Sequence, residues 1–425
     1  MKTTICSVGD SIYITDMPAE YDIQPLKKII EQADVKLFNL ENVLSDEPIY
    51  GSSYCGGTWL LAKEKTLDDV LKFGFNGCSF ANNHTMDYSY DGMFSTLNAV
   101  GKRNLPCSGA GKDLPEASAH AVIETPNGKV GLISICSTFN DAARAGNPSD
   151  TVPGRPGLNG LRFSTVYEIT PEHMKALQEM AEGTCIDGRR NRSRAGGYTP
   201  KVPEGCFGFG EYVFRESETE GKTTKANAVD LERTVNGIKR ALEECEQVVV
   251  IVHSHEIKHM TDDEPDDFLV EFCHACVDAG ASAVIGTGTH QLKAIELYQG
   301  KPIFYSLGNF IFQSDDAFCM PDDFREKYKA PHGLTPKEQI EWRAKGGKDL
   351  HTDVNNFRSL MPFMTFEDGK LTEAILYPLR LSMENGLPAL ADEAEAKQIL
   401  DYMNERNKPY GTKLTLENGA FVLHL

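Results

Sequence analysis

The sequence predicts an α/β fold, and two observations along the chain support this class. Between residues 3 and 136, short apolar runs typical of strands alternate with amphipathic stretches typical of helices. The alternation resumes at residue 227 and includes Gln247–Val252, a continuous apolar run of the kind that forms buried parallel strands. Because loops at the carboxyl ends of parallel strands converge on one crevice, the polar residues that follow these runs are candidates for a ligand site.

The first block of the alternation leads into the most polar of these strand ends. We expect strands and helices to alternate there, with strands at 3–8, 35–42 and 75–81 and helices at 21–32, 62–73 and 91–103. The segments 119–124 and 130–136 should form a hairpin, because Asn127 and Gly128 between them favour a tight turn. The strand at 75–81 runs directly into Asn82-Asn83-His84-Thr85-Met86-Asp87. Amide, imidazole and carboxylate groups therefore stand where a strand ends and a helix begins.

The second block repeats the pattern and closes the chain. Its expected helices lie at 230–245, 265–279 and 392–407, and its buried strands lie at 247–252 and 283–286. Strand pairs are expected at 294–298 with 303–305 and at 361–366 with 371–378. The two blocks together predict one α/β domain over residues 1–425, in which residues 355–425 complete the core.

Two less regular segments interrupt the alternation. Residues 140–227 are rich in Gly, Pro, Arg and Ser, and only 171–182 has a helical pattern. They contain a basic island at 188–197, which includes Arg189, Arg190 and Arg192. The island is either a solvated loop or a lid or rim near the site, whose arginines would bind an anionic substrate. The second insertion, 316–354, is charged and has a helical stretch at 335–343.

Composition excludes several classes of function. The 425 residues carry a formal net charge of −19 at pH 7, which argues against a nucleic-acid-binding surface. No run of about 18 apolar residues occurs, so no membrane span is expected. The N-terminus lacks a signal-peptide pattern, and most of the 11 cysteines lie inside strand or helix patterns. Both observations favour a reducing, cytoplasmic location. An anionic small-molecule or polymeric substrate remains compatible with this charge, since a divalent cation inverts the local field. The oligomeric state stays open.

Several expected strands end in side chains that can bind a metal. These residues are Asp10, Glu41, Asn83, His84, His253, His255, Glu256 and His290. Each one alone is explained by a turn or a helix cap. Their repetition at separate strand ends is harder to explain by packing, because such ends share one edge of a sheet. Carboxylate, amide and imidazole donors without thiolate suit Mn²⁺, Fe or Zn²⁺ in a hydrolytic site with one or two ions.

The order of the motifs gives the chain a family resemblance. The motifs are Gly9-Asp10, Asn39-Leu40-Glu41, Ala81-Asn82-Asn83-His84 with Asp87, the segment at His253, Gly286–His290 and Tyr305-Ser306-Leu307-Gly308-Asn309-Phe310. They resemble the CapA family, the poly-γ-glutamate capsule-synthesis type of the calcineurin-like metallophosphoesterase superfamily. The resemblance covers roughly 1–140, 228–315 and 355–425. It implies a layered β-sandwich flanked by helices, with the two insertions added to it.

The resemblance also implies a role for each matched residue. The metal ligands would be Asp10, Glu41, Asn83, His253 and His290, with Glu41 in the bridging position. His84 would act as the general acid, and Asp87 and His255 join it as candidate catalytic residues. Asn82 and Asn309 would shape the site or contact the substrate. A metal-activated water would then attack a phosphoester or a γ-glutamyl-type amide.

Some positions depart from the superfamily pattern. Ile12 stands where an Asp-x-His motif would place histidine, and Thr287-Gly288-Thr289 precede His290. His253-Ser254-His255-Glu256 replaces the usual His-Trp-Gly-x-Glu, so His255 could supply a replacement ligand. These departures keep two alternatives open. One is a non-catalytic accessory or binding protein of poly-γ-glutamate metabolism with a degenerate metal site. The other is an α/β protein whose polar strand ends are only turns and caps.

Overall fold

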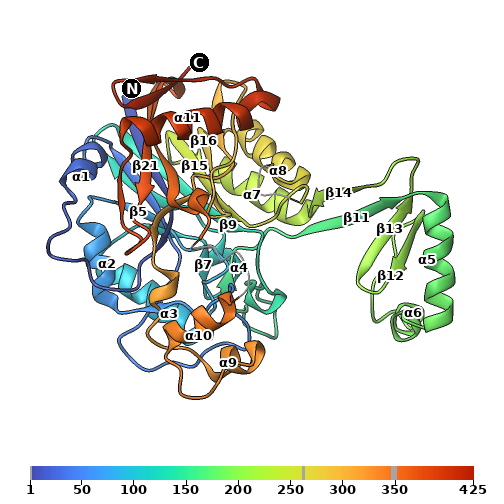
Figure 1. Ribbon diagram of the computed structural model, residues 1–425. Coiled ribbons are helices and arrows are strands. Elements are labelled where there is room, and N and C mark those ends of the chain that lie inside the picture. The colour runs from blue at the N-terminus through green and yellow to red at the C-terminus, as the bar shows by residue number, and fades with distance from the viewer. Residues whose placement is uncertain (1, 261–263, 346–351) are drawn as a thin grey trace.

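The computed structural model describes residues 2–260, 264–345 and 352–425, and it has an α/β fold (Figure 1). Two large sheets and the helices around them form the body of the molecule, and a smaller module projects from it. Within the described residues, no helix combines the length and the apolar character needed to cross a membrane.

The larger sheet has the strand order β23-β24-β21-β20-β1-β2-β5-β6, with β19 paired to β1 and β22 paired to β21. Strand β1 (Lys2–Ile12) is parallel to β2 (Val35–Leu40) and to β19 (Asn309–Phe312), and β2 is parallel to β5 (Gly77–Ser79). The hairpin of β20 (Arg358–Glu367) and β21 (Lys370–Leu381) continues the sheet on the other side of β1. The remaining strands are β6 (Cys107–Ser108), β22 (Pro388–Leu390), β23 (Leu414–Glu417) and β24 (Ala420–Leu423).

The smaller sheet has the order β17-β18-β16-β15-β9-β8. Its centre is parallel, since β15 (Gln247–Ser254) pairs in parallel with β9 (Gly128–Cys136) and with β16 (Ala283–Gly288). The other strands are β8 (Ala121–Thr125), β17 (Ile295–Tyr298) and β18 (Lys301–Phe304). The antiparallel pairs β8–β9, β17–β18 and β20–β21 confirm the predicted strand pairs.

The alternation of side chains along β15 explains how the sheets are packed. Val249 and Ile251 belong to a buried cluster that also contains Leu37 of β2 and Met364 of β20, so the two sheets pack against each other. The alternate residues Val248, Val250 and Val252 pack with helices on the opposite face. Because both faces are covered, the strand is apolar throughout.

Helices cover the outer faces of both sheets. Buried residues of α1 (Gln24–Ile30), α2 (Glu64–Leu71) and α3 (Ser89–Lys102) share a core cluster with the larger sheet. Those of α7 (Ala228–Ala241) and α8 (Asp267–Asp278) share one with the smaller sheet. Helix α11 (Glu393–Asn407) begins with a capping box between Asp392 and Glu395. The short elements are β3 (Val43–Leu44), β4 (Leu61–Ala62), β7 (Ala110–Gly111), α4 (Leu114–Ala117) and β10 (Gly157–Leu158).

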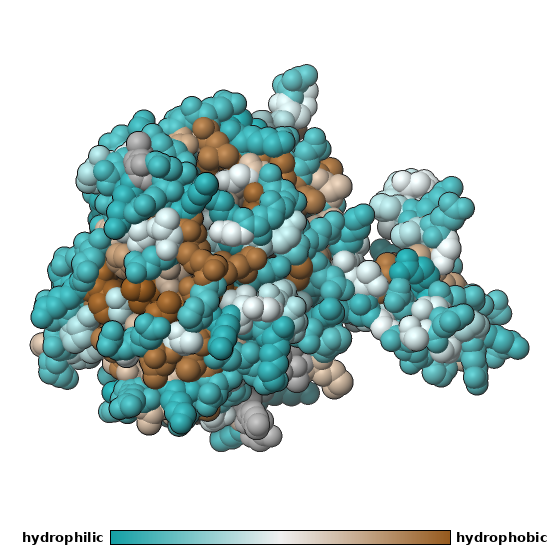
Figure 2. Space-filling view, turned by 90° about the horizontal axis from the view of Figure 1, so that it is seen from above, coloured by the Kyte–Doolittle hydropathy of each residue, from teal (hydrophilic) through white to brown (hydrophobic). Residues whose placement is uncertain are grey.

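Residues 163–226 form a module that projects from the body, and we call it the arm (Figure 1). Its sheet has the order β12-β13-β11-β14. The elements are β11 (Phe163–Ile169), α5 (Pro171–Thr184), α6 (Gly188–Ala195), β12 (Cys206–Phe209), β13 (Tyr212–Glu216) and β14 (Gly221–Ala226). Viewed from above, the arm again stands clear of the body, and its visible surface is mostly hydrophilic (Figure 2).

The arm corrects one expectation about the first insertion. The basic island contains the helix α6, in which no residue is buried, so it is solvated but helical and not a loop. Its charged, non-periodic sequence hides the helix, because no apolar face packs on a core. The arm also lies away from the sheets of the body (Figure 1). Residues 140–162 of the same insertion stay with the body, where Ala143 and Leu158 are part of its core and Asn140 lines a cavity.

The second insertion packs on the body. It contains α9 (Asp322–Tyr328) and α10 (Pro336–Ala344), and the predicted helical stretch at 335–343 is confirmed. Thr335 caps the N-terminus of α10, and its side chain accepts a hydrogen bond from the Glu338 amide. Phe324 and Ile340 are buried with Trp59 and Tyr88 of the body, so the two helices share a small core with it.

Candidate metal centre

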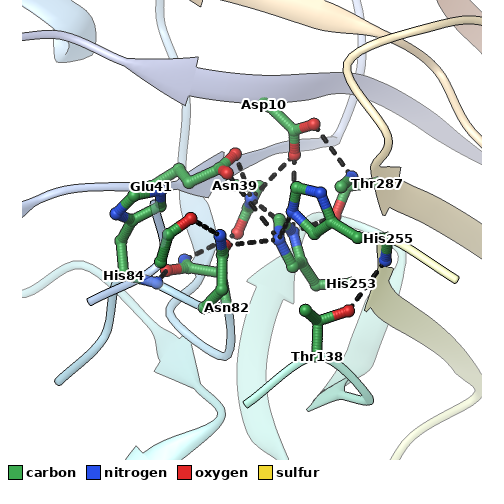
Figure 3. Close-up of polar contacts among 12 residues, drawn as sticks. Asp10, Asn39, Glu41, Asn82, His84, Thr138, His253, His255 and Thr287 are labelled. Carbon is green, nitrogen blue, oxygen red and sulfur yellow. Dashed lines mark hydrogen bonds and ion pairs between the residues drawn. The ribbon is translucent and has the colours of Figure 1, made fainter. Parts of the chain in front are cut away.

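The candidate site lies at the carboxyl ends of parallel strands from both sheets. Asp10 in β1 pairs in register with Asn39 in β2, and Glu41 follows β2. In the smaller sheet, His253 of β15 pairs with Thr287 of β16. All five residues are buried, and Figure 3 shows their side chains converging. Asp10 lies inside β1, which is longer than the predicted strand at 3–8.

Two asparagines connect the carboxylates to the Asn82–Asp87 segment. The Asn39 Nδ2 donates to Asp10 Oδ1 at 2.9 Å and to Glu41 Oε2 at 3.3 Å. The Asn39 Oδ1 accepts from Asn82 Nδ2 at 3.2 Å. The Asn82 Oδ1 in turn accepts from the backbone amide of His84 at 3.1 Å. Asn82 also donates to Leu40 O at 2.7 Å, so its hydrogen bonds hold the segment against the end of β2.

Three histidines face the carboxylates. The His253 Nε2 lies 2.8 Å from Asn83 Oδ1 and 3.1 Å from His255 Nε2. The His290 Nδ1 lies 2.8 Å from Asn309 Oδ1, and the His290 ring centroid lies 5.3 Å from that of His255. His290 has a φ of 59°. A left-handed backbone at a non-glycine residue stores about 1–3 kcal/mol, and such strain is common at functional sites.

Burial and neighbouring charges set the protonation of this cluster. Burial raises the pKa of Asp10, but its hydrogen bond to His253 and the charges of His253 and His290 outweigh burial and hold that pKa below its usual range. Burial raises the pKa of Glu41 well above its ordinary value, and the charge of Asp10 adds to this shift. Burial lowers the pKa of His290 to about 4, and it also holds the pKa of His255 well below its ordinary value. Both imidazoles are therefore neutral at pH 7, which is the form that binds metals.

Two sets of donor atoms have the spacing of a metal site. One is formed by Glu41, His255 and His290, and the other by Asp10, Glu41 and His253, with the donor atoms of each set within 4.8 Å of one another. The Glu41 Oε1 is buried and accepts no hydrogen bond from any described residue. It lies 3.7 Å from His253 Nε2 and 4.0 Å from His290 Nε2. A buried carboxylate oxygen without a donor is costly, so these residues fit a divalent cation.

His84 is held beside this cluster by a buried carboxylate. The His84 Nδ1 lies 2.7 Å from Asp87 Oδ2. Asp87 also accepts hydrogen bonds from the backbone amides of Gly56 and Leu60, each at 2.9 Å. A methyl group on Gly56 would lie 2.8 Å from His84 Cε1 and 2.5 Å from Asn83 Nδ2. Only glycine allows this loop to approach the two side chains so closely.

A second, partly buried network holds His255. Its backbone amide donates to Thr138 Oγ1 at 2.8 Å, and Thr138 donates to the Glu256 carboxylate at 2.9 Å. Ser137 and Ser254 also donate to Glu256, at 2.5 and 2.8 Å. Glu256 is thus fully engaged as a support for the loop and not as a metal ligand.

Two cavities give access to the cluster. One of about 250 Å³ is lined by His84, His255 and His290. The other, of about 380 Å³, is lined by Asn83, Thr138 and His255. Both are also lined by Gly56 and Gly57, so this glycine pair borders each of them.

The structure brings most of the candidate residues together. The cluster and its supports include Asp10, Glu41, Asn82, Asn83, His84, Asp87, His253, His255, His290 and Asn309. Arg189, Arg190 and Arg192 are not among them, because they lie on α6 in the arm, where Arg190 pairs with Glu211 at 3.0 Å. None of the three lines either of the two cavities at the cluster.

Sequence reasoning missed the supports that come from elsewhere in the chain. The loop Gly56–Leu60 holds Asp87, and Thr138 holds His255. The adjacent glycines Gly56 and Gly57 were a usable signal, since paired glycines often mark a close backbone approach. Thr138 carries no comparable signal.

The fold and the site define an α/β protein with a buried oxygen and nitrogen donor cluster at converging strand ends, which is a candidate metal centre. A family model described as "Bacterial capsule synthesis protein PGA_cap" matches residues 6–314. The chain belongs to this metallophosphoesterase-like family, which is the CapA type that the motifs indicated. The matched range includes the arm and ends before the second insertion and residues 355–425.

Individual relatives agree with this assignment. The chain is 27% identical over 440 residues to the uncharacterized protein y4sH of Sinorhizobium fredii, covering 99% of this chain and 93% of that protein. It is 26% identical to the PGA biosynthesis protein CapA of Bacillus subtilis, covering 69% of this chain and 57% of that protein. It is 22% identical to the capsule biosynthesis protein CapA of Bacillus anthracis, covering 73% of this chain and 60% of that protein.

Proposed function

We propose that the protein is a metal-dependent hydrolase that cleaves a phosphoester or a γ-glutamyl-type amide in an anionic substrate. The observation that carries the proposal is Glu41 Oε1, a buried carboxylate oxygen that lies between His253 and His290 and has no hydrogen-bond donor among the described residues. Membership of a metallophosphoesterase-like family supports it. The two packed sheets with helices outside support a calcineurin-like layering, which is part of the same proposal.

In this proposal, the chain's own residues hold one or two ions of Mn, Fe or Zn. Glu41 belongs to both donor sets and takes the bridging position. The other ligands are Asp10, Asn83, His253 and His290, and His255 serves as the replacement ligand. A bound cation would supply an acidic water and a positive charge for the substrate's oxygen atoms.

His84 is the proposed general acid. Asp87 binds its Nδ1 at 2.7 Å and fixes the ring, and His84 also lines the 250 Å³ cavity. The ring can therefore present its other nitrogen to a leaving group in that cavity. Asn309 contacts His290 Nδ1, so it orients that ligand through a hydrogen bond.

A non-catalytic accessory protein is the second candidate function. One observation favours it: Ile12, which stands at the position of a superfamily histidine, lines the same cavity. Loss of that imidazole weakens one metal position. The two CapA relatives are named for PGA and capsule biosynthesis, which makes an anionic polymer a reasonable ligand for either function.

Elemental analysis tests the proposal. Protein purified without chelator should contain stoichiometric Mn, Fe or Zn, and both Asp10→Ala and His290→Ala should remove it. His274→Ala is the matched control, because His274 pairs with Glu296 outside the cluster, and this variant should retain the metal. Phosphodiesters and γ-glutamyl amides would then be screened for turnover. Metal near zero in folded wild-type protein would refute the hydrolase and leave the accessory function.

A further inference from the structure

The cavity beside the candidate metal centre has one wall from the second insertion. Its lining includes His84, His255 and His290 together with Thr58 and Arg343. Arg343 lies near the end of α10. Among the described residues that line this cavity, it is the only arginine or lysine.

The contacts of Arg343 fix its head group without neutralising its charge. Its Nη1 donates to Thr58 Oγ1 at 2.9 Å. The guanidinium lies 5.7 Å from the ring centroid of Phe324 and 6.0 Å from that of Tyr328. Within residues 2–260, 264–345 and 352–425, no carboxylate forms an ion pair with it, and Thr58 accepts its one hydrogen bond. A guanidinium has five N–H donors, so most of them are available to a ligand.

We infer that Arg343 forms an anion subsite next to the metal centre and binds a phosphate or carboxylate group of the ligand. The inference rests on the proposed function for the identity of the neighbouring centre, and it adds the residue that selects a charged ligand. A planar guanidinium donates two parallel hydrogen bonds to such oxyanions. The contacts with two aromatic rings and the hydrogen bond to Thr58 hold that plane in position before a ligand arrives.

Arg343 and the candidate metal ligands come from different parts of the chain. The family match ends at residue 314, so Arg343 comes from a segment outside the matched range. The same loop that accepts its hydrogen bond, at Thr58, also holds Asp87 through Gly56 and Leu60. The second insertion therefore supplies ligand selection to a site whose metal-binding groups come from the matched part of the chain.

Calorimetric titration with inorganic phosphate and with glutarate tests the subsite. Both probes are titrated into the protein as purified and after treatment with chelator. Arg343→Gln removes the charge, and Arg343→Met also keeps the apolar stem against Phe324 and Tyr328. Lys337→Gln is the control, because Lys337 lies on the same helix, is exposed and pairs with Asp316 at 3.6 Å. Thermal unfolding identifies variants that remain folded.

We expect Arg343→Gln and Arg343→Met to lower the affinity for the better-bound probe about 10-fold or more. Lys337→Gln should change this affinity less than about twofold. The probe with the larger loss identifies phosphate or carboxylate as the preferred group. Unchanged affinity in the folded Arg343→Met variant, an equal loss in Lys337→Gln, or no binding of either probe by wild-type protein would overturn the subsite. Absence of metal would refute the hydrolase proposal but not the subsite, since the loss of affinity in the Arg343 variants is expected in chelator-treated protein as well.

Discussion

Removal of the Asp87 carboxylate is the most direct test of how the site is held. This side chain has no exposed surface and accepts three hydrogen bonds, from His84 Nδ1 at 2.7 Å and from the amides of Gly56 and Leu60 at 2.9 Å. Asp87→Ala leaves two backbone N–H groups without an acceptor, that of Leu60 buried and that of Gly56 partly buried. Each such group costs about 1–3 kcal/mol, so the free energy of unfolding should fall by about 2–6 kcal/mol.

Asp87→Asn should have a smaller effect. Its amide oxygen can accept one of the two backbone hydrogen bonds, which leaves a loss of about 1–3 kcal/mol. Burial raises the pKa of Asp87, with His84 opposing it, so the neutral amide also avoids part of the cost of a buried charge. In Asp87→Ala, His84 loses its acceptor, and turnover of any substrate found should fall by about 10²-fold or more. The amide oxygen of Asp87→Asn, in the place of Oδ2, would keep the contacts with His84 and Leu60, so turnover should fall less in this variant.

Urea unfolding followed by tryptophan fluorescence measures this loss. Trp59 is a suitable reporter, because it is 4% exposed and its Nε1 donates to Ser52 O at 3.0 Å in the same loop region. Asp150→Ala, at an exposed loop position, is the matched control and should stay within about 0.5 kcal/mol of wild type. If Asp87→Ala unfolds with the same free energy as this control, the proposed role of Asp87 as the anchor of the loop is refuted.

Two further predictions concern the metal-free protein and the glycine loop. Burial lowers the pKa of His290 from 6.5 to about 4, so the unfolded chain takes up this proton first as the pH falls. The corresponding stability is fully present above about pH 6.5 and is lost towards pH 4, about 3 kcal/mol in total. Urea titrations of chelator-treated protein across this pH range should show that the free energy of unfolding falls less steeply with pH in His290→Asn than in wild type. Equal pH dependence in the two proteins would contradict the role given to His290. Gly56→Ala should displace Asn83 and His84 and lower stability by about 1–3 kcal/mol together with metal content. Gly101→Ala, where an added methyl group contacts nothing within 4 Å, should be neutral or stabilising, and metal retained by both variants would show that the close approach at Gly56 is not needed.

The sequence was most informative where one physical signal dominates. Apolar runs bounded by polar residues predicted the parallel strands, and turn residues such as Asn127-Gly128 predicted the hairpin of β8 and β9. The convergence of Asp10, Glu41 and His253 followed from the geometry of parallel strands alone.

The remaining features depend on contacts between distant segments. The helix α6 has no buried residue, so its sequence has no periodic apolar face from which a helix could be predicted. Arg343 reaches the cavity because α9 and α10 pack on the body through Phe324 and Ile340. That packing is tertiary, and a charged stretch with few apolar residues gave no indication of its direction.

The way in which the arm joins the body has a consequence for how such proteins diversify. Strand β11 leaves the body and β14 returns beside it, with Phe163 directly opposite Ala226. Directly opposed residues lie about 4.5–5.5 Å apart, a gap that a two-residue turn can bridge. Phe163 stacks on Phe268 of α8 with ring centroids 4.1 Å apart, so this junction is anchored on the body side. The arm can therefore be gained, exchanged or lost as one unit without changing the path of the chain through the sheets. A recognition property carried by the arm would be inherited separately from the chemistry of the metal centre.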